Sequence, residues 1–465
     1  MANRFYLAII LFFAFTLSAD AALQVHPSNP RYFTDSSGKA IYLGGHQSFY
    51  DLQDRTSGLI YGYQSQLDWN WYIQFLNRRN LNYIRNWTEF HVGPSSPAGV
   101  YPLPFLRVQG YGDATDGQPK VDLYQFNQEF FDRMRARAIH AGNNGVYISY
   151  MLFDVYGLSN YGGSIWNGNL FNPANNINGI NADLNGDGWG VEFFTNPTSE
   201  IRRIQENYAR KVVDTIGDLG NVFIEVSNEA PNTSWHYDMI NYIKAYMLRQ
   251  SKRLPIFLSP GGLNGANTYE NWSYRESADS PADVISVSGD WSSYTTDPPV
   301  NNSNRPMIID MDHVDPLNNS RTIPWKAFTR GYHFTLYDRP FEKPEQEFSI
   351  WENTRMNIGA VNSYAQRMDL AAMNPSTSVC STSFCLVNPG IEYLIYQPDG
   401  GPFFVNLQVG NYSYEWFNPS SASLGNTGTI TAEGGSQSFN PPFEGDAVLY
   451  LKSAGASEPT ACADF

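Results

Sequence analysis

The chain has 465 residues, of which 42% are hydrophobic and 16% charged, and its formal net charge at pH 7 is −15. This length exceeds that of one small domain and predicts two domains, one of them large. The acidic balance and the lack of a basic run in the sequence argue against nucleic acid or an anionic membrane surface as the main partner.

The first residues, MANRFYLAIILFFAFTLSADA, have the pattern of a secretory signal. Arg4 precedes an apolar run over 5–17 and a cleavage motif that ends at Ala21. The run is short for a membrane span, and no second one follows in the sequence. We therefore treat 1–21 as a signal peptide and expect an exported protein, extracellular or periplasmic, without membrane attachment.

Beyond the signal, apolar strand-like runs alternate with amphipathic helical stretches. One helix, 198–220, has Thr198 as its expected N-cap and Gly220 at its expected end. Eight strands separated by helices over roughly 330 residues predict a parallel (β/α)8 TIM barrel with long loops. In chain order the predicted elements are strand 40–45, helix 63–80, strand 82–87, helix 121–142, strand 145–154, helix 198–220, strand 221–229, helix 235–253, strands 254–260, 282–290 and 305–314, helix 324–332, strand 333–338 and helix 347–373.

After about Pro375 the helical period ends, and short alternating runs are separated by Gly, Pro and Asn turns. This pattern predicts a small antiparallel β-sandwich. The predicted fold class is thus α/β, a TIM barrel followed by a C-terminal β-sandwich. The expected boundaries are signal 1–21, barrel 22–375, β-sandwich 376–453 and tail 454–465.

Three cysteines lie near the C-terminus. Cys380 and Cys385, five residues apart, can close a small loop, so we expect a disulfide between them in an oxidising compartment. Cys462 is left free or pairs between molecules. The sequence contains neither a CxxC nor an HExxH motif, so it predicts no zinc site.

A barrel presents its reacting groups at the carboxyl ends of its strands. Because strand side chains alternate, Glu225, Ser227 and Glu229 should share one face. By the same argument Asp310 and Asp312 share a face of the seventh strand. Polar or aromatic residues at the strand ends are His46, Gln47, Arg85, Asn86, Trp87, Glu89, His91, Asp154, Tyr156, Asn228, Glu229, Asp290, Trp291, Asp310, Asp312, His313 and Asp338.

Two carboxyl groups facing each other at a barrel mouth are what glycoside hydrolysis requires. One acid protonates the leaving oxygen, and one carboxylate attacks the sugar or activates water. The proton donor needs a raised pKa, which burial or a neighbouring carboxylate supplies. We therefore consider Glu229 and Asp312 the candidate pair.

The Asn-Glu pair that ends the fourth strand resembles the signature of glycoside hydrolase clan A. The segments HPSNPRYFTDSSGKAIYLGGHQS, NPANNINGI, EVSNE, IIDMDHV and FNPPFEGDAVLYLK resemble cellulase-like and apiosidase-like barrels of that clan. These relatives carry a β-domain labelled as the collagen-binding domain of a collagenase. The resemblance implies that Glu229 is the acid/base and that Asn228 binds the sugar 2-hydroxyl.

The sequence departs from the clan at the seventh strand, where an Asp-Met-Asp-His segment replaces the usual Glu nucleophile. Asp312 is the favoured nucleophile and Asp310 the alternative. The acid that does not attack would be a hydrogen-bonding neighbour or a sugar ligand, and we expect the two acids to titrate as a unit.

Further side chains at the strand ends are candidate substrate ligands, although each could equally be a satisfied core residue. Glu225 lies deeper than Glu229, and Arg85 is its natural buried partner. The DLNGDG segment is similar to the start of an EF-hand calcium loop, with Asp183, Asn185 and Asp187 at the ligand positions. Phe194 occupies the position where such a loop has a bidentate Glu, so a solvated loop without calcium is favoured. The candidate substrate ligands are Asn228, His46, Arg85, Trp87, Asp154, Tyr156, Trp291 and His313.

These observations predict a secreted, retaining O-glycoside hydrolase that acts on a plant or microbial glycan. We expect a monomer that binds a carbohydrate, with no cofactor other than a possible structural Ca²⁺. The alternative is a carbohydrate- or matrix-binding protein that keeps the barrel without catalysis. A peptidase is disfavoured, because the sequence has no metal motif and no GxSxG serine.

Overall fold

The computed structural model describes most of the chain after the expected signal. The signal 1–21, most of the expected tail 454–465 and Cys462 lie outside the described residues. The described residues are 22–48, 50–55, 67–93, 99–158, 165–228, 230–259, 263–264, 268–269, 280–287, 296–310, 320–337 and 349–455.

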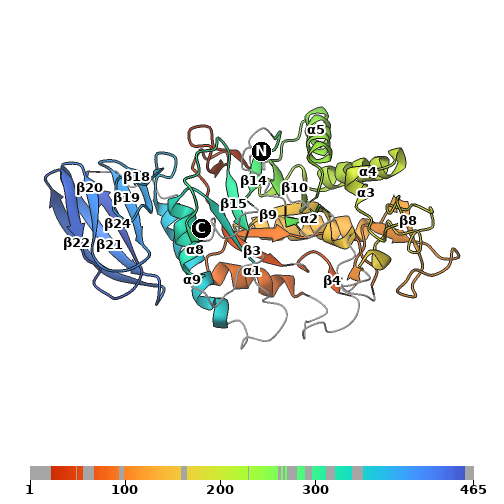
Figure 1. Ribbon diagram of the computed structural model, residues 1–465, viewed down its shortest axis with the longest axis horizontal. Helices are drawn as coiled ribbons and strands as arrows, with labels where there is room; N and C mark the ends of the chain where they lie inside the picture. Colours follow the sequence, from red (N-terminus) through yellow and green to blue (C-terminus); the bar gives the residue numbers. More distant parts are fainter. Residues whose placement is uncertain are drawn as a thin grey trace, which may run out of the picture.

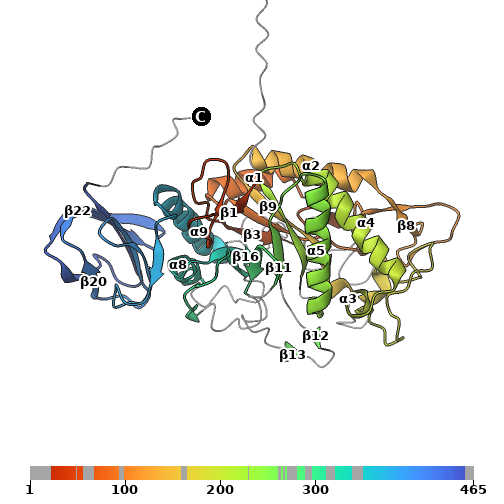
Figure 2. The same cartoon turned by 90° about the horizontal axis from the view of Figure 1, so that it is seen from above.

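Eight parallel strands form a closed barrel, which confirms the predicted fold class. Strands adjacent in the chain pair around the barrel, and the last strand pairs with the first to close it. Helices cover the outside of the barrel (Figures 1 and 2). The barrel strands are β3 (Gly44–Ser48), β5 (Tyr83–Asn86), β9 (Tyr147–Asp154), β10 (Val222–Asn228), β11 (Ile256–Ser259), β14 (Val284–Ser286), β15 (Met307–Asp310) and β16 (His333–Tyr337).

The helices and smaller strands of this domain complete the barrel. The helices are α1 (Trp69–Arg78), α2 (Gln128–Gly142), α3 (Glu192–Thr195), α4 (Ser199–Ile216), α5 (Thr233–Arg249), α8 (Thr322–Thr329) and α9 (Ser349–Arg367), with 3₁₀ turns η1 (Tyr156–Leu158) and η3 (Trp166–Gly168). The short strands are β1 (Gln24–Val25), β2 (Phe33–Thr34), β4 (Asp54–Arg55), β6 (Val100–Tyr101), β7 (Phe105–Arg107), β8 (Val121–Phe126), β12 (Leu263–Asn264) and β13 (Thr268–Tyr269).

The alternation of strand side chains divides the barrel core into two regions. One apolar cluster joins residues on or next to different barrel strands, which can meet only inside the barrel. The neighbouring strand residues pack outward against the helices. The interior cluster includes Leu43, Tyr83, Phe223, Phe257, Val284 and Ile308. Polar side chains that follow these residues by two positions therefore also point inward.

The predicted helix 121–142 is wrong in its first third. Residues 121–126 form β8, which pairs antiparallel with β7, and the helix begins only after Asn127. The Asn127 side chain accepts a hydrogen bond from the backbone N–H of Glu129 at 3.2 Å and so caps α2. The apolar spacing of VDLYQF fits a helix, but pairing with β7 overrides that local preference.

Other boundaries shift by a few residues. Thr198 caps α4 as predicted, since its Oγ accepts from the backbone N–H of Ile201 at 3.2 Å. The helix ends at Ile216, with Gly217 as its C-cap, rather than at Gly220. The first barrel strand covers Gly44–Ser48 instead of 40–45.

The C-terminal domain is built only of antiparallel pairs among its described strands. A six-stranded sheet faces a two-stranded one, and their apolar side chains form a common core that contains Phe403, Val405, Trp416 and Leu449. A disulfide joins Cys380 to Cys385. The large sheet has the order β17 (Asn374–Ser376), β18 (Cys385–Asn388), β19 (Glu392–Gln397), β24 (Ala447–Ser453), β21 (Gly410–Asn418) and β22 (Ser423–Ala432), and the small one pairs β20 (Phe403–Leu407) with β23 (Gly435–Phe439).

The β-domain lies against α8 and α9, on one side of the barrel (Figure 1). Trp325 and Phe328 of α8 and Tyr364 of α9 form one apolar core with residues of the β-domain such as Tyr396 and Phe417. The two domains therefore share buried apolar surface rather than only a linker.

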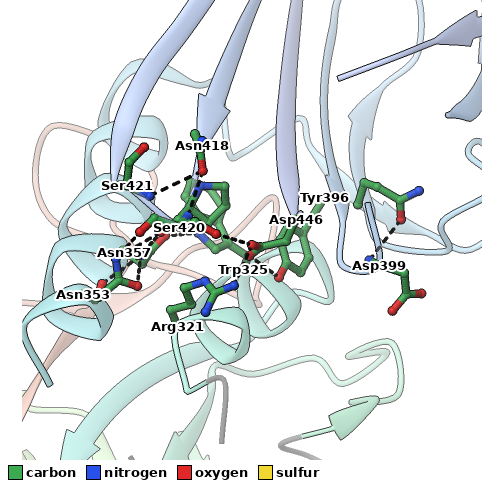
Figure 3. Close-up of polar contacts among 12 residues, drawn as sticks. Arg321, Trp325, Asn353, Asn357, Tyr396, Asp399, Asn418, Ser420, Ser421 and Asp446 are labelled. Atoms are coloured by element: carbon green, nitrogen blue, oxygen red, sulfur yellow. Dashed lines mark hydrogen bonds and ion pairs between the residues drawn. The ribbon is translucent and has the colours of Figure 1, made fainter. Parts of the chain in front are cut away.

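A polar cluster closes the same joint (Figure 3). Asp446, whose side chain is 1% exposed, accepts hydrogen bonds from Arg321 at 3.0 Å and from the Tyr396 hydroxyl at 3.1 Å. On the helical side, Asn357 accepts from the indole N–H of Trp325 at 2.7 Å and donates to the carbonyl of Pro419 at 2.9 Å. These bonds fix the direction in which the β-domain meets the barrel.

Candidate active site

The centre of the candidate site is Arg85, the third residue of β5, which is fully buried inside the barrel. An arginine has five N–H donors, and each of them finds an acceptor here. Nε donates to Glu225 at 2.9 Å, and Nη2 donates to Glu225 at 2.6 Å and to Asn228 at 2.8 Å. Nη1 donates to Gln47 at 3.0 Å and to Asp310. Arg85 therefore positions other side chains, from β3, β10 and β15, at the centre of the barrel.

The charges of this cluster determine its protonation. Burial alone would lower the pKa of Arg85, but the carboxylates of Asp310 and Glu225 raise it well above its ordinary value. Burial raises the pKa of Glu225, against the opposing effect of Arg85. The prediction that Arg85 pairs with a structural Glu225 is confirmed.

Strand β10 contains a bulge just before its end. From Glu225 to Asn228 it advances three residues while β11 advances two, from Phe257 to Ser259. The extra residue breaks the alternation. Ser227 bonds to His236 of α5, outside the barrel, at 2.5 Å, so the prediction that it shares a face with Glu225 is wrong.

The bulge turns Asn228 into the barrel interior. Its Oδ1 accepts from Arg85 at 2.8 Å, and its Nδ2 donates to Asp154 at 3.4 Å. Asn228 is thus oriented by a cation on one side and a carboxyl on the other, at the carboxyl end of the fourth barrel strand. This is where the sequence predicts a sugar ligand.

Asp310 ends the seventh strand and lies inside the barrel. One carboxylate oxygen accepts from Gln47 Nε2 at 2.5 Å, and the other accepts from Arg85. Ile308, two residues earlier, is in the interior apolar cluster, as the predicted alternation requires. Asp310 is 2% exposed.

Asp154, at the end of β9, is the third acid of the interior. It accepts from Asn228 and from the backbone N–H of Gly157 at 3.3 Å. Burial raises its pKa to about 6, although hydrogen bonds from the backbone of Tyr156 and Gly157 oppose the shift. A carboxyl that titrates near neutrality in a barrel interior is typical of functional sites.

His46 does not take its predicted place. It lies on the outer face of β3, where its Nδ1 bonds to the hydroxyl of Tyr72 on α1 at 2.7 Å and its ring packs edge-on against Phe75. The next residue, Gln47, points inward instead. The expectation that His46 is a substrate ligand is therefore corrected, because the strand phase places it beneath a helix.

Two aromatic candidates differ in exposure. Trp87 is 3% exposed and its ring lies 5.0 Å from the guanidinium of Arg85, so it covers the central cation. Tyr156 is 41% exposed in η1, directly after β9. Tyr156 thus has the surface that stacking against a sugar would need.

Several predicted site residues lie outside the described part of the chain. They are Glu229, Trp291, Asp312 and His313, together with the strand-end acids Asp290 and Asp338. Strand β10 ends at Asn228, so Glu229 is the residue that follows it in sequence.

The calcium-like segment forms a loop closed by its own hydrogen bonds. Asp183 accepts from the backbone N–H groups of Gly186 at 2.8 Å, Asp187 at 3.1 Å and Gly188 at 3.0 Å. Asn185 donates to Asp187 at 2.9 Å. Across the described part of the chain, no three His, Cys, Asp or Glu side chains converge in a way that could hold a metal ion.

Sequence reasoning gave no role to Gln47 and Ser259, which both contact Arg85. Gln47 could have been found from its phase with Leu43, since residues four apart on a strand share a face. Ser259 could have been found in the same way, since it lies two residues after Phe257, whose side chain belongs to the interior apolar cluster.

Comparison with known proteins supports the fold. No family model matches the sequence, and no curated protein gives a significant match. A solved structure named "Glycoside hydrolase" has a TM-score of 0.56 at 13% identity and covers 94% of this chain and 98% of its own. A glycoside hydrolase family 5 structure from Bacteroides vulgatus ATCC 8482 has a TM-score of 0.56 at 12% identity, with 94% of both chains covered. The chain therefore has the fold of these structures, β-domain included.

Among the described residues, none of the helices has the length and apolarity that crossing a membrane requires.

Proposed function

We propose that the protein is a secreted, retaining O-glycoside hydrolase that acts on a plant or microbial polysaccharide or oligosaccharide. The observation that carries the proposal is the buried cluster of Arg85, Asn228 and Asp310 at the carboxyl ends of the second, fourth and seventh barrel strands. The fold shared with structures named glycoside hydrolases supports it.

In the proposed reaction Glu229 gives its proton to the glycosidic oxygen while Asp312 attacks the anomeric carbon and forms a glycosyl-enzyme ester. Glu229, now a carboxylate, takes a proton from water, and the resulting hydroxide equivalent breaks the ester and releases the sugar. Asn228, held by Arg85 and Asp154, donates or accepts a hydrogen bond at the sugar 2-hydroxyl.

Asp310 is the alternative nucleophile, and its contacts favour a supporting role. Both of its oxygens already accept strong hydrogen bonds from Gln47 and Arg85. A carboxylate held in this way stabilises positive charge at the sugar and is a weaker attacking group than a freer one. Asp312 follows two residues later and remains the preferred nucleophile.

The first test replaces Glu229 by Gln and measures reducing-sugar release across a panel of polysaccharides. We expect a loss of at least about 10²-fold, because general acid catalysis typically supplies 10²–10⁴-fold. The control is Glu200→Gln, an acid of similar chemistry on the outer helix α4, which should keep full activity. Full activity of Glu229→Gln would show that the assignment is wrong.

A second experiment separates Asp310 from Asp312. Each is replaced by Gly, and sodium azide is added as a small external nucleophile. Azide should restore turnover of an activated aryl glycoside only where the missing carboxylate was the nucleophile, which we expect for Asp312. Rescue of Asp310→Gly alone would reverse the assignment.

The alternative is a sugar-binding barrel without catalysis. It would bind oligosaccharides but release no reducing sugar, and Glu229→Gln would leave binding and the absent turnover unchanged.

A further inference from the structure

Contacts on the outside of the barrel accompany the inward turn of Asn228. Ser227, the residue before it, is fully buried, and its hydroxyl bonds to Nε2 of His236 at 2.5 Å. His236 is also fully buried and lies near the start of α5, the helix that follows β10 in the chain. The bond therefore ties the end of β10 to the beginning of α5.

The neighbouring strand β9 is held against the same helix. Phe153 pairs with Ser227 in the parallel register, and the next residues, Asp154 and Asn228, pair as well. The Phe153 ring packs edge-on against Trp235 of α5, with 5.7 Å between the ring centroids. The start of α5 thus contacts the two outward side chains, while the two residues that follow them bond to each other inside the barrel at 3.4 Å.

The start of α5 is fixed by hydrogen bonds of its own. Asn232 caps the helix, since its Oδ1 accepts from the backbone N–H of Trp235 at 3.2 Å. The indole N–H of Trp235 donates to Gln205 of α4 at 3.1 Å, and the Gln205 amide donates to the carbonyl of Phe193 at 2.7 Å. Trp235 and His236 therefore present a fixed surface to the ends of β9 and β10.

The bond between Ser227 and His236 favours the outward orientation of the serine. A bulge adds one residue to a strand and changes the direction of the side chains around it. A buried hydroxyl costs free energy unless it is hydrogen-bonded, so Ser227 is most stable where His236 meets it. Burial lowers the pKa of His236 to about 3, so the imidazole is neutral at pH 7 and acts through its position and not through a charge.

We propose that His236 is a positioning residue for the sugar site. By holding Ser227 on the outer face of β10, it keeps the side chain of Asn228 directed into the barrel, between Arg85 and Asp154. His236 acts through Ser227 and the backbone of β10, from outside the barrel. The consequence for the sugar 2-hydroxyl that Asn228 binds rests on the proposed function. The effect of His236 on the orientation of Asn228 does not.

Three substitutions separate this bond from the packing around it. In His236→Gln the side-chain amide reaches the position of the imidazole Nε2, so it still bonds to Ser227. In His236→Asn the shorter side chain places its amide at the level of Nδ1, so the bond is lost. Ser227→Ala removes only the hydroxyl and tests the same bond if His236→Asn does not fold. The control is Met239→Ala, which truncates another buried side chain of α5, one turn further along the helix.

The first test needs no sugar and uses crystal structures of the variants. In the native protein the guanidinium of Arg85 donates to Asn228 at 2.8 Å. We expect His236→Gln and Met239→Ala to keep this hydrogen bond, and His236→Asn and Ser227→Ala to lose it because the end of β10 is no longer held outward. An Asn228 side chain that stays bonded to Arg85 in both of the latter variants would overturn the proposal.

The second test measures recognition of the 2-hydroxyl. An aryl glycoside of the sugar released from the polysaccharide panel is compared with the analogue that lacks the 2-hydroxyl on the sugar joined to the aryl group. The ratio of the two kcat/KM values does not depend on how much of the enzyme is folded, so a loss of stability alone leaves it unchanged.

The expected ratios distinguish positioning from packing. We expect His236→Asn and Ser227→Ala to lower the ratio at least about tenfold, because the hydrogen bond to the 2-hydroxyl strengthens in the transition state. His236→Gln and Met239→Ala should keep it within about threefold of the wild-type value, since neither breaks the bond to Ser227. An unchanged ratio in both His236→Asn and Ser227→Ala would overturn the role in recognition.

The two proposals can fail separately. If no member of the panel is hydrolysed, the proposed function fails, and the crystal structures decide whether His236 orients Asn228. If hydrolysis depends on Glu229 but Asn228 keeps its place in His236→Asn and Ser227→Ala, the positioning role fails and the proposed function stands.

Discussion

At the scale of single residues, one guanidinium organises the candidate site. All five N–H groups of Arg85 donate hydrogen bonds to side chains from β3, β10 and β15. Arg85 therefore fixes the positions of four side chains, those of Gln47, Glu225, Asn228 and Asp310. A lysine could not replace it, because an ammonium group has three donors and no planar fork. The arrangement holds Asn228 and Asp310 in place before any substrate arrives.

The cost of removing this cation can be predicted. Arg85→Met leaves the buried carboxylates of Glu225 and Asp310 without a counter-charge, so it should lower the free energy of unfolding by about 3–5 kcal/mol. Urea unfolding followed by circular dichroism measures this loss. The control is Arg203→Met on α4, whose exposed ion pair should cost less than about 0.5 kcal/mol. A loss below 1 kcal/mol for Arg85→Met would contradict the organising role.

The predictions for single residues are confirmed where side chains alternate regularly between the two faces of a strand. Arg85 pairs with Glu225, as expected of a buried cation and a buried acid, although β9 lies between their two strands. Asp310 shares its face with Ile308 as expected.

His46 and Gln47 lie beyond the end of the predicted strand 40–45, so the prediction did not separate them. The observed strand Gly44–Ser48 places His46 against Tyr72 on α1 and Gln47 against Asp310. A strand end predicted three residues too early is enough to assign the wrong neighbour to the site.

At the scale of elements, strand ends and helix starts decide which side chains reach the barrel interior. The bulge in β10 inserts one residue between Glu225 and Asn228 and brings the asparagine inward. The sequence around it, EVSN, contains no glycine or proline that would mark a bulge. The position of Asn228 therefore follows from pairing with β9 and β11 and could not be predicted from local pattern.

The start of α2 gives a test at this scale. Asn127 caps the helix through its Oδ1 and also donates to the carbonyl of Leu103 at 3.0 Å. Asn127→Ala should lower the free energy of unfolding by about 0.5–2 kcal/mol, the usual cost of a lost N-cap. The predicted helix 121–142 would place this residue in a helix interior, where alanine is the better residue and the change would stabilise the protein. Stabilisation measured by urea unfolding would thus contradict the observed start.

At the scale of the whole molecule, the barrel and the β-domain form one structural unit. The shared apolar core around Trp325 and the buried Asp446 make the joint resemble a domain interior. The sequence predicted both domains, since each has its own hydrophobic period. It could not predict the joint, because contacts such as Arg321 with Asp446 connect residues far apart in the chain.

Asp446→Ala tests the joint. The substitution leaves Arg321 and the Tyr396 hydroxyl without their acceptor, so we expect a loss of about 2–5 kcal/mol. Differential scanning calorimetry should show one unfolding transition for the wild type and an earlier β-domain transition for the variant. Asp399→Ala, an exposed position near the same cluster (Figure 3), is the control and should leave the single transition unchanged. Two transitions in the wild type would contradict a single unit.

In the proposed reaction, two carboxyls of this barrel carry out double displacement at a sugar. The most direct measurement follows the anomeric protons by NMR during the first minutes of hydrolysis of the substrate found in the polysaccharide panel. We expect the first product to have the same anomeric configuration as the substrate and then to mutarotate, and we expect Glu229→Gln to form it at least about 10²-fold more slowly. A first product of opposite configuration, or no product from any member of the panel, would contradict it.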